Sequence, residues 1–98
     1  MSSYRYSSAA NADIEEIVLY VFDLNPVAAH RFLNALEETC ELLAEHPLIG
    51  RLRPELAGNL RSFAIGNYLV FYMPAPHGVD VARVIYGGRD LPGIFRRT

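Results

Sequence analysis

The sequence predicts an α+β fold in which a helical hairpin packs on a small antiparallel sheet, with the element order β-α-α-β-β-β. Three observations support this prediction. Apolar residues recur at helical spacing from about residue 9 to residue 45. From residue 60 to residue 86 the pattern is strand-like, and Gly66-Asn67 marks a tight hairpin turn. The alternating segment Tyr4-Arg5-Tyr6-Ser7 adds a short first strand.

The length of 98 residues fits a single domain over residues 1–98. Hydrophobic residues make up 51% and charged residues 20%, a balance that favours a compact core over disorder. No apolar run approaches the roughly 18 residues that a membrane span needs. The first residues also lack the basic and apolar stretches of a signal peptide. We therefore expect a small, soluble, cytoplasmic domain without a membrane partner.

The first predicted helix follows the first strand. We expect Ser8 to cap it and Ala9 to begin it. Its apolar face comprises Ala10, Ile14, Ile17, Val18 and Val21. Asp13, Glu15 and Glu16 lie near its start, where the helix dipole favours acidic side chains.

The second predicted helix starts at Asn25-Pro26, where a capping side chain precedes a proline in the first turn. Its apolar face comprises Ala29, Phe32, Leu33, Leu36, Cys40 and Leu43. His46-Pro47 ends it, because the residue before a proline avoids the helical region. A connection this short predicts an antiparallel helical hairpin.

A loop and the remaining strands follow. Residues 46–59 hold two prolines and two glycines, which indicates a loop. Strands are expected over residues 60–65, 68–73 and 79–86, with a longer turn over residues 74–78. A final helical turn is expected over residues 91–95.

Along the last of these strands, strict alternation gives two faces. One face carries Val79, Val81, Arg83 and Ile85, and the other carries Asp80, Ala82, Val84 and Tyr86. This pattern places Arg83 among hydrophobic neighbours.

Charge is unevenly distributed along the chain. Residues 1–50 carry two arginines and eight carboxylates, a balance of -6, whereas residues 51–98 carry seven arginines and three carboxylates, a balance of +4. Together they give the net charge of -2, and all nine basic residues are arginines. The distribution indicates an acidic helical part and a basic sheet part.

Several kinds of chemistry find no support in the sequence. His30, His46 and His77 lack the spacing of metal ligands, so we expect no metal or other cofactor. Cys40 lies on an apolar helix face, where a free cysteine behaves as a small hydrophobe. Gly87-Gly88 follows a strand, but no long helix follows to bind phosphate.

Arginines and aromatic residues on the predicted strands and their flanks remain as candidates for binding. They are Arg61, Tyr68, Phe71, Tyr72, Arg83, Tyr86 and Arg89. Such a group can bind nucleic acid through phosphates and stacked bases, or it can bind an acidic protein segment. In the structural alternative, the rings form core and Arg83 snorkels or pairs with a carboxylate. Two helices cover only one face of a sheet, which favours a partner for the exposed remainder.

The order of these signals also resembles a known family. The segments that carry the resemblance are Tyr6-Ser7, Asp13 to Ile17, Phe32 to Leu36, Leu43 to Pro47, Ile49-Gly50-Arg51, Leu60-Arg61-Ser62, Gly66 to Tyr72 and Val81 to Asp90. Their order and spacing match over nearly the whole chain, roughly residues 4 to 92. The chain resembles the ParE branch of the RelE/ParE toxin superfamily of type II toxin–antitoxin systems.

The resemblance implies a helical hairpin on an antiparallel sheet of three or four strands. It implies a toxin that inhibits DNA gyrase and has no catalytic residues of its own. A ParD-type antitoxin would neutralise it by tight binding, in a complex that can be a heterotetramer. No direct sequence-specific binding of nucleic acid is expected.

Two departures and two alternatives accompany the resemblance. Tyr86 and Gly88 stand where the family block, usually RVxHGRRD, has histidine and arginine. A non-toxic relative that only binds antitoxin is one alternative. The other is a RelE-like ribosome-dependent endoribonuclease, for which Arg61, Arg83 and Tyr86 would supply the catalytic groups.

Overall fold

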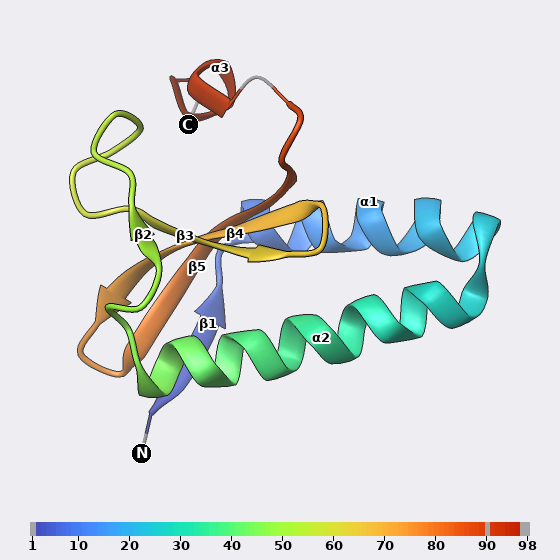
Figure 1. Cartoon of the computed structure of the whole chain (residues 1–98), viewed down its shortest axis with the longest axis horizontal. Coiled ribbons are helices and arrows are strands. Elements are labelled where there is room, and N and C mark those ends of the chain that lie inside the picture. Colours follow the sequence, from blue (N-terminus) through green and yellow to red (C-terminus); the bar gives the residue numbers. More distant parts are fainter. Residues whose placement is uncertain (1, 90, 97–98) are drawn as a thin grey trace.

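The computed structural model describes residues 2–89 and 91–96, and it has the predicted α+β fold (Figure 1). The element bounds in chain order are β1 (Ser3–Tyr6), α1 (Ser8–Leu24), α2 (Pro26–Glu45), β2 (Arg51–Leu52), β3 (Arg61–Ile65), β4 (Tyr68–Ala75), β5 (Gly78–Tyr86) and α3 (Leu91–Arg96). Within the described residues no helix is long and apolar enough to cross a membrane.

The helix boundaries follow local chemistry. Ser7, not Ser8, is the N-cap of α1, and its side chain accepts a hydrogen bond from the backbone N of Ala10. The prediction was therefore wrong by one residue. Asn25 caps α2 as expected and accepts from the backbone N of Val27 at 3.0 Å. The helix ends before Pro47, also as expected.

The sheet has five strands in the order β1-β5-β4-β3-β2, and it is mixed rather than wholly antiparallel. The first strand runs parallel to the last, with Tyr6 opposite Val81. The other neighbours are antiparallel. The predicted loop over residues 46–59 contains the two-residue strand β2, which pairs with β3. The pairings of β1 and β2 bring together segments that no local pattern connects.

The two hairpin turns of the sheet differ in how well they were predicted. Gly66, with φ of +56°, occupies the first turn position between β3 and β4, as the sequence indicates. The second turn is shorter than predicted, because β4 extends to Ala75 and β5 begins at Gly78. Pro74 can lie within β4 because β3 pairs with β4 only as far as Tyr72, which leaves an edge beyond it.

A β-bulge interrupts β5 and overturns the predicted faces of this strand. Phe71 of β4 lies opposite Arg83, whereas its neighbour Tyr72 lies opposite Val81, so Ala82 is the extra residue. Val81 and Val84 consequently pack in the same core under the helices. Ile85 lies in the core on the other face.

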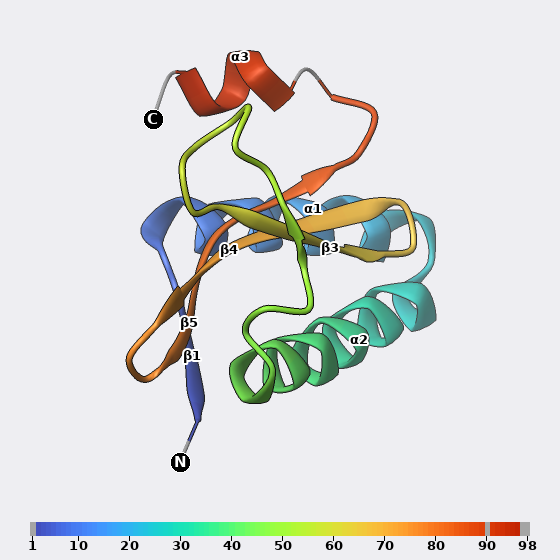
Figure 2. The same cartoon turned by 60° about the vertical axis from the view of Figure 1, so that its left-hand side comes forward.

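Both faces of the sheet are covered, in contrast to the expectation from two helices alone. The core under α1 and α2 includes Leu43, Val70 and Tyr72. On the opposite face, α3 and the loop segment 53–59 cover Leu60, Phe71 and Ile85 (Figure 2). The Phe71 and Phe95 rings meet edge to face, with centroids 4.8 Å apart. The predicted final helical turn is therefore the cover of the second core.

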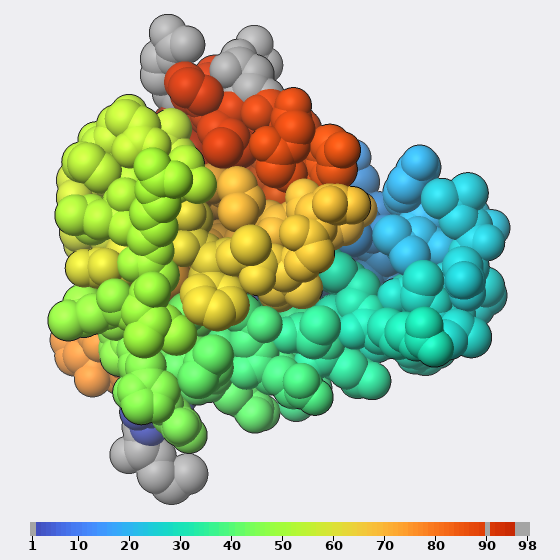
Figure 3. All heavy atoms as spheres, in the orientation of Figure 1, coloured from blue at the N-terminus to red at the C-terminus, as the bar shows by residue number. Residues whose placement is uncertain are grey.

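The turn of the helical hairpin extends beyond the sheet. Figure 1 shows the ends of α1 and α2 that meet near Asn25 lying past the strands, and Figure 3 shows this tip projecting from the body of the molecule. Side chains near the tip therefore have no strand beneath them.

Candidate functional site

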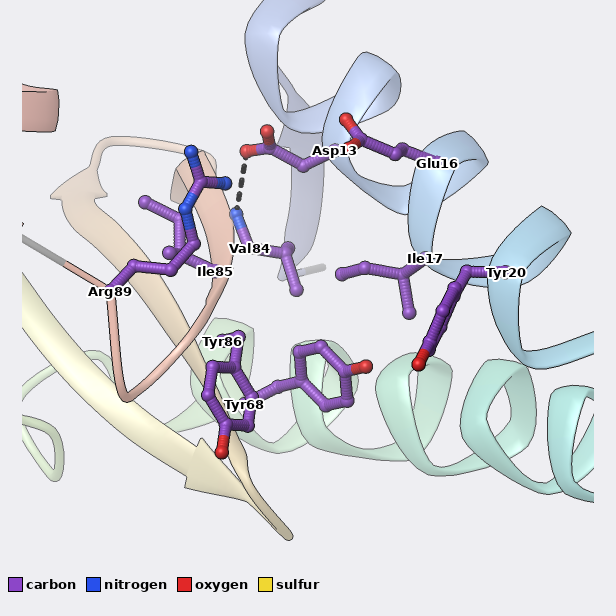
Figure 4. A pocket seen from close by; sticks show the side chains of 9 residues that line it. All are labelled: Asp13, Glu16, Ile17, Tyr20, Tyr68, Val84, Ile85, Tyr86 and Arg89. Carbon is purple, nitrogen blue, oxygen red and sulfur yellow. Dashed lines mark hydrogen bonds between the residues drawn. The ribbon is translucent and has the colours of Figure 1, made fainter.

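An open groove of about 290 Å³ lies between α1 and the strands β4 and β5 (Figure 4). Three of the predicted candidates, Tyr68, Tyr86 and Arg89, line its sheet side. The opposite wall comes from α1 and includes Asp13, Glu16, Ile17 and Tyr20. No local pattern in the sequence indicates the α1 wall, because only the packing angle of α1 on the sheet brings these side chains here.

Aromatic contacts fix the floor of the groove. The Tyr68 ring is half-buried and meets Phe32 of α2 edge to face, at a centroid distance of 5.2 Å. The Tyr86 ring meets Tyr68 in the same way at 6.0 Å and remains 50% exposed. Phe32 thus fixes the position of the Tyr68 ring, and Tyr86 presents aromatic surface to solvent.

The Tyr86 side chain also explains the glycine at position 88. A Cβ atom built on Gly88 would lie 2.6 Å from the Cε2 atom of Tyr86, closer than real Cβ contacts. The turn is fixed on either side, since the backbone N of Gly87 donates to the Asn67 oxygen at 2.9 Å and the N of Arg89 donates to the Tyr86 oxygen at 3.1 Å. The two departures from the family block are therefore structurally coupled.

A buried ion pair stands behind the groove. The Arg83 guanidinium donates through Nε to Oδ2 of Asp13 at 2.7 Å and through Nη2 to Oδ1 at 2.9 Å. The Arg83 side chain is only 16% exposed and that of Asp13 only 10%. The hydrogen bond to Asp13 raises the pKa of Arg83, which is charged at every accessible pH.

The same carboxylate completes the edge of the sheet. Oδ2 of Asp13 also accepts from the backbone N of Val84 at 3.1 Å, where β1 no longer pairs with β5. Just before this point, Ser7 donates through its backbone N to the Val81 oxygen and through Oγ to the Ala82 oxygen. These bonds satisfy the backbone groups around the bulge and tie α1 to β5.

Two other predicted residues, Arg61 and Tyr72, hold the loop after α2 rather than lining the groove. Arg61 donates through Nη1 to the Gly50 oxygen at 2.8 Å and to the Leu48 oxygen at 3.1 Å. The Tyr72 hydroxyl donates to the Pro47 oxygen at 2.7 Å and accepts from the Gly50 nitrogen at 2.9 Å. Burial raises the pKa of Tyr72, against smaller lowering effects of Gly50 and Arg61.

The remaining candidate, Phe71, is fully buried, as is Tyr72. Neither ring offers surface to a partner in this conformation.

The residues of the alternative endoribonuclease site do not come together: Arg61 lies on β3 and Arg83 on β5, with β4 between them. Each of these two guanidinium groups is bonded to its own acceptors. No group of three or more His, Cys, Asp or Glu side chains among the described residues could hold a metal ion.

The groove therefore combines apolar and aromatic surface with one cation and one anion. Arg89 is exposed on the sheet side, and Glu16 is exposed on α1. Asp13, although it lines the groove, is neutralised by Arg83. A planar guanidinium beside aromatic rings suits a protein segment that offers a carboxylate together with apolar side chains.

Comparison with known proteins gives a consistent result. The model of the family described as ParE toxin of type II toxin–antitoxin system, parDE, matches residues 4–91. The chain is 33% identical over 87 residues to Toxin ParE1 of Caulobacter vibrioides, covering 88% of this chain and 90% of that protein. It is also similar in fold to a chain from a solved chromosomal ParDE system of P. aeruginosa. That match has a TM-score of 0.72 and 18% identity, and it covers 88% of this chain and 96% of the other.

Proposed function

The chain belongs to the ParE toxin family of type II toxin–antitoxin systems, and from this membership we propose that it inhibits DNA gyrase and is neutralised by a ParD-type antitoxin. We place both activities in the cytoplasm. The observation that supports a protein partner best is the groove, because three of the seven predicted candidates, Tyr68, Tyr86 and Arg89, line it together.

The groove has the composition of a protein interaction site. Tyrosine and arginine dominate binding energy at interfaces, because a ring adds area at low entropic cost and a guanidinium forms paired hydrogen bonds. Tyr86 is half exposed above a ring that is already fixed by Phe32, so binding requires little further ordering. We propose that an antitoxin segment contacts Tyr86 with an apolar side chain and Arg89 with a carboxylate.

We assign no catalytic residue. Arg61 and Arg83, which an endoribonuclease mechanism would need free to act on RNA, are bonded to backbone oxygens and to Asp13 respectively. Their positions are explained by the fold itself. This geometry favours inhibition through binding over chemical cleavage.

The proposed groove is tested by the affinity of the purified chain for a purified ParD-type antitoxin. We expect Arg89→Ala and Tyr86→Ala each to raise Kd by about tenfold or more, the effect of losing a hot-spot side chain. Arg51→Ala is the matched control, because Arg51 is an exposed arginine on β2 outside the groove. Equal affinities for the control and the groove variants would refute this assignment.

Toxicity is tested by expressing the chain in cells without antitoxin. We expect growth arrest with a DNA-damage response, relieved when the antitoxin is co-expressed. Normal growth on abundant folded protein would contradict the proposal and favour the non-toxic relative. Cleaved messenger RNA in translating extracts would instead favour the endoribonuclease.

A further inference from the structure

The last two turns of α1 are apolar around their whole circumference. Residues 17–24 read IVLYVFDL, with Asp23 as the one charged side chain and the Tyr20 hydroxyl as the other polar group. A helix segment of this kind is normally buried on all sides. Here, however, Leu19 is 61% exposed and Phe22 50% exposed. This segment lies at the projecting tip of the hairpin (Figures 1 and 3).

The exposed side chains form a stripe on the outer face of α1. Leu19 follows the fully buried Ala10 by nine residues, or two and a half helical turns, and so points directly away from the core. Phe22 lies three residues further on, next to Leu19 on the surface. Ala12 and Glu15 continue the stripe toward the start of the helix at the same spacing. We call Ala12, Glu15, Leu19 and Phe22 the outer stripe.

Every charged side chain of α1 is a carboxylate. Asp13 is bonded to Arg83 and faces the core. The other three, Glu15, Glu16 and Asp23, are exposed and lie within or beside the outer stripe. The outer face of α1 therefore combines large apolar side chains with uncompensated negative charge on its own helix.

We propose that the outer stripe binds an amphipathic helix of a protein partner whose apolar face is bordered by lysine or arginine. The i, i+3, i+7 spacing of the stripe matches the ridge of side chains that a second helix presents. Basic residues on that helix would face Glu15, Glu16 and Asp23, and such complementarity determines which partner is accepted. The outer stripe itself lies outside the groove, whereas Glu16 borders both surfaces. The inference does not depend on gyrase as the target.

The charges argue against a second copy of this chain as the occupant. Two α1 helices packed stripe to stripe would bring six carboxylates into one interface, with no basic residue on either helix to offset them. The apolar area is also modest. Exposed side chains of this size contribute roughly 100 Å² each, well below the 800 Å² or so that one partner of a standard interface buries. Charge complementarity must therefore supply part of the affinity.

Two designed helical peptides of about 18 residues test the proposal. They share one leucine stripe and differ only in their flanking residues, which are lysine in one and glutamate in the other. Fluorescence anisotropy of the labelled peptides with the intact chain should show at least tenfold tighter binding of the lysine peptide. This preference should shrink as salt is raised, because screening weakens exposed charge pairs.

Variants of the chain locate the binding. The double variant Leu19→Gln/Phe22→Gln should weaken the lysine peptide at least tenfold, and Glu15→Gln/Asp23→Asn should reduce the preference for lysine over glutamate. Leu48→Gln is the matched control, because Leu48 is 69% exposed in the loop after α2. Circular dichroism of each variant verifies that the fold is retained.

Three results would overturn the proposal. In the first, the two peptides bind equally. In the second, Leu19→Gln/Phe22→Gln binds the lysine peptide as tightly as the unaltered chain. In the third, sedimentation shows that the chain alone self-associates through the outer stripe and that Leu19→Gln/Phe22→Gln abolishes the association, which would identify a second copy as the occupant.

Discussion

Replacing Asp13 with alanine removes the acceptor of three hydrogen bonds at once. These are the bonds from Nε and Nη2 of Arg83 and from the backbone N of Val84, at 2.7, 2.9 and 3.1 Å. Removing one partner of a buried ion pair costs about 3–5 kcal/mol, because the remaining charge is left uncompensated. Arg83 keeps 16% of its side chain exposed and regains some solvation, so we expect the lower end, about 3 kcal/mol.

Urea unfolding followed by circular dichroism at pH 7 measures this loss. In a domain of this size each 1 kcal/mol corresponds to about 4–8 °C in Tm, so in thermal unfolding Asp13→Ala should lower Tm by roughly 12–24 °C. Asp13→Asn retains one side-chain oxygen and should lose less. Adding Arg83→Met to Asp13→Ala should recover part of the stability, because it removes the unpaired charge. A loss below about 1 kcal/mol for Asp13→Ala, or simple additivity of the two substitutions, would refute the reasoning.

Three further predictions concern other parts of the molecule. Tyr72→Phe removes both hydrogen bonds between the Tyr72 hydroxyl and the backbone of the loop after α2. It should lower the free energy of unfolding in urea by about 1–3 kcal/mol, and an unchanged midpoint would show that the loop does not need these bonds. Burial raises the pKa of Cys40 and of Tyr6 above their ordinary values of 9.0 and 10.0, so the folded chain holds these protons more tightly than the unfolded chain. Stability should therefore be level below about pH 8 and fall as pH rises above 9, and a constant urea midpoint up to pH 10.5 would contradict this. Gly88→Arg should displace the Tyr86 ring and lower the free energy of unfolding by about 1 kcal/mol. This loss should disappear when Tyr86→Ala is also present, and a double-mutant cycle without coupling would count against the contact.

The parts of the fold that the sequence predicts are those determined by neighbouring residues. Asn25-Pro26 and His46-Pro47 define α2 because a cap and a proline act on the backbone next to them. Gly66 identifies the β3–β4 turn for the same reason, since it adopts a positive φ. The parallel pairing of β1 with β5 and the bulge at Ala82 depend on contacts between distant segments, and no local pattern encodes them.

The candidate site likewise has residues that the local sequence predicts and residues that only the tertiary structure brings into place. The sequence predicts Tyr68, Tyr86 and Arg89 as members of a group of seven arginines and aromatic residues on the strands and their flanks, and these three line one groove. For Arg83 the sequence offered pairing with a carboxylate as the structural alternative, and the structure shows this pair. It did not identify Asp13 as the partner, although a carboxylate on the apolar face of a helix is a signal for a buried ion pair. The position of Tyr20 opposite the sheet left no such signal, because it depends on how α1 crosses the strands.

A supercoiling assay with purified gyrase, relaxed plasmid and this chain tests the proposed function most directly. We predict that the chain inhibits supercoiling and traps cleaved DNA, and that a stoichiometric amount of the ParD-type antitoxin restores the reaction. Gyrase activity that is unaffected by a large excess of folded chain would contradict the proposal.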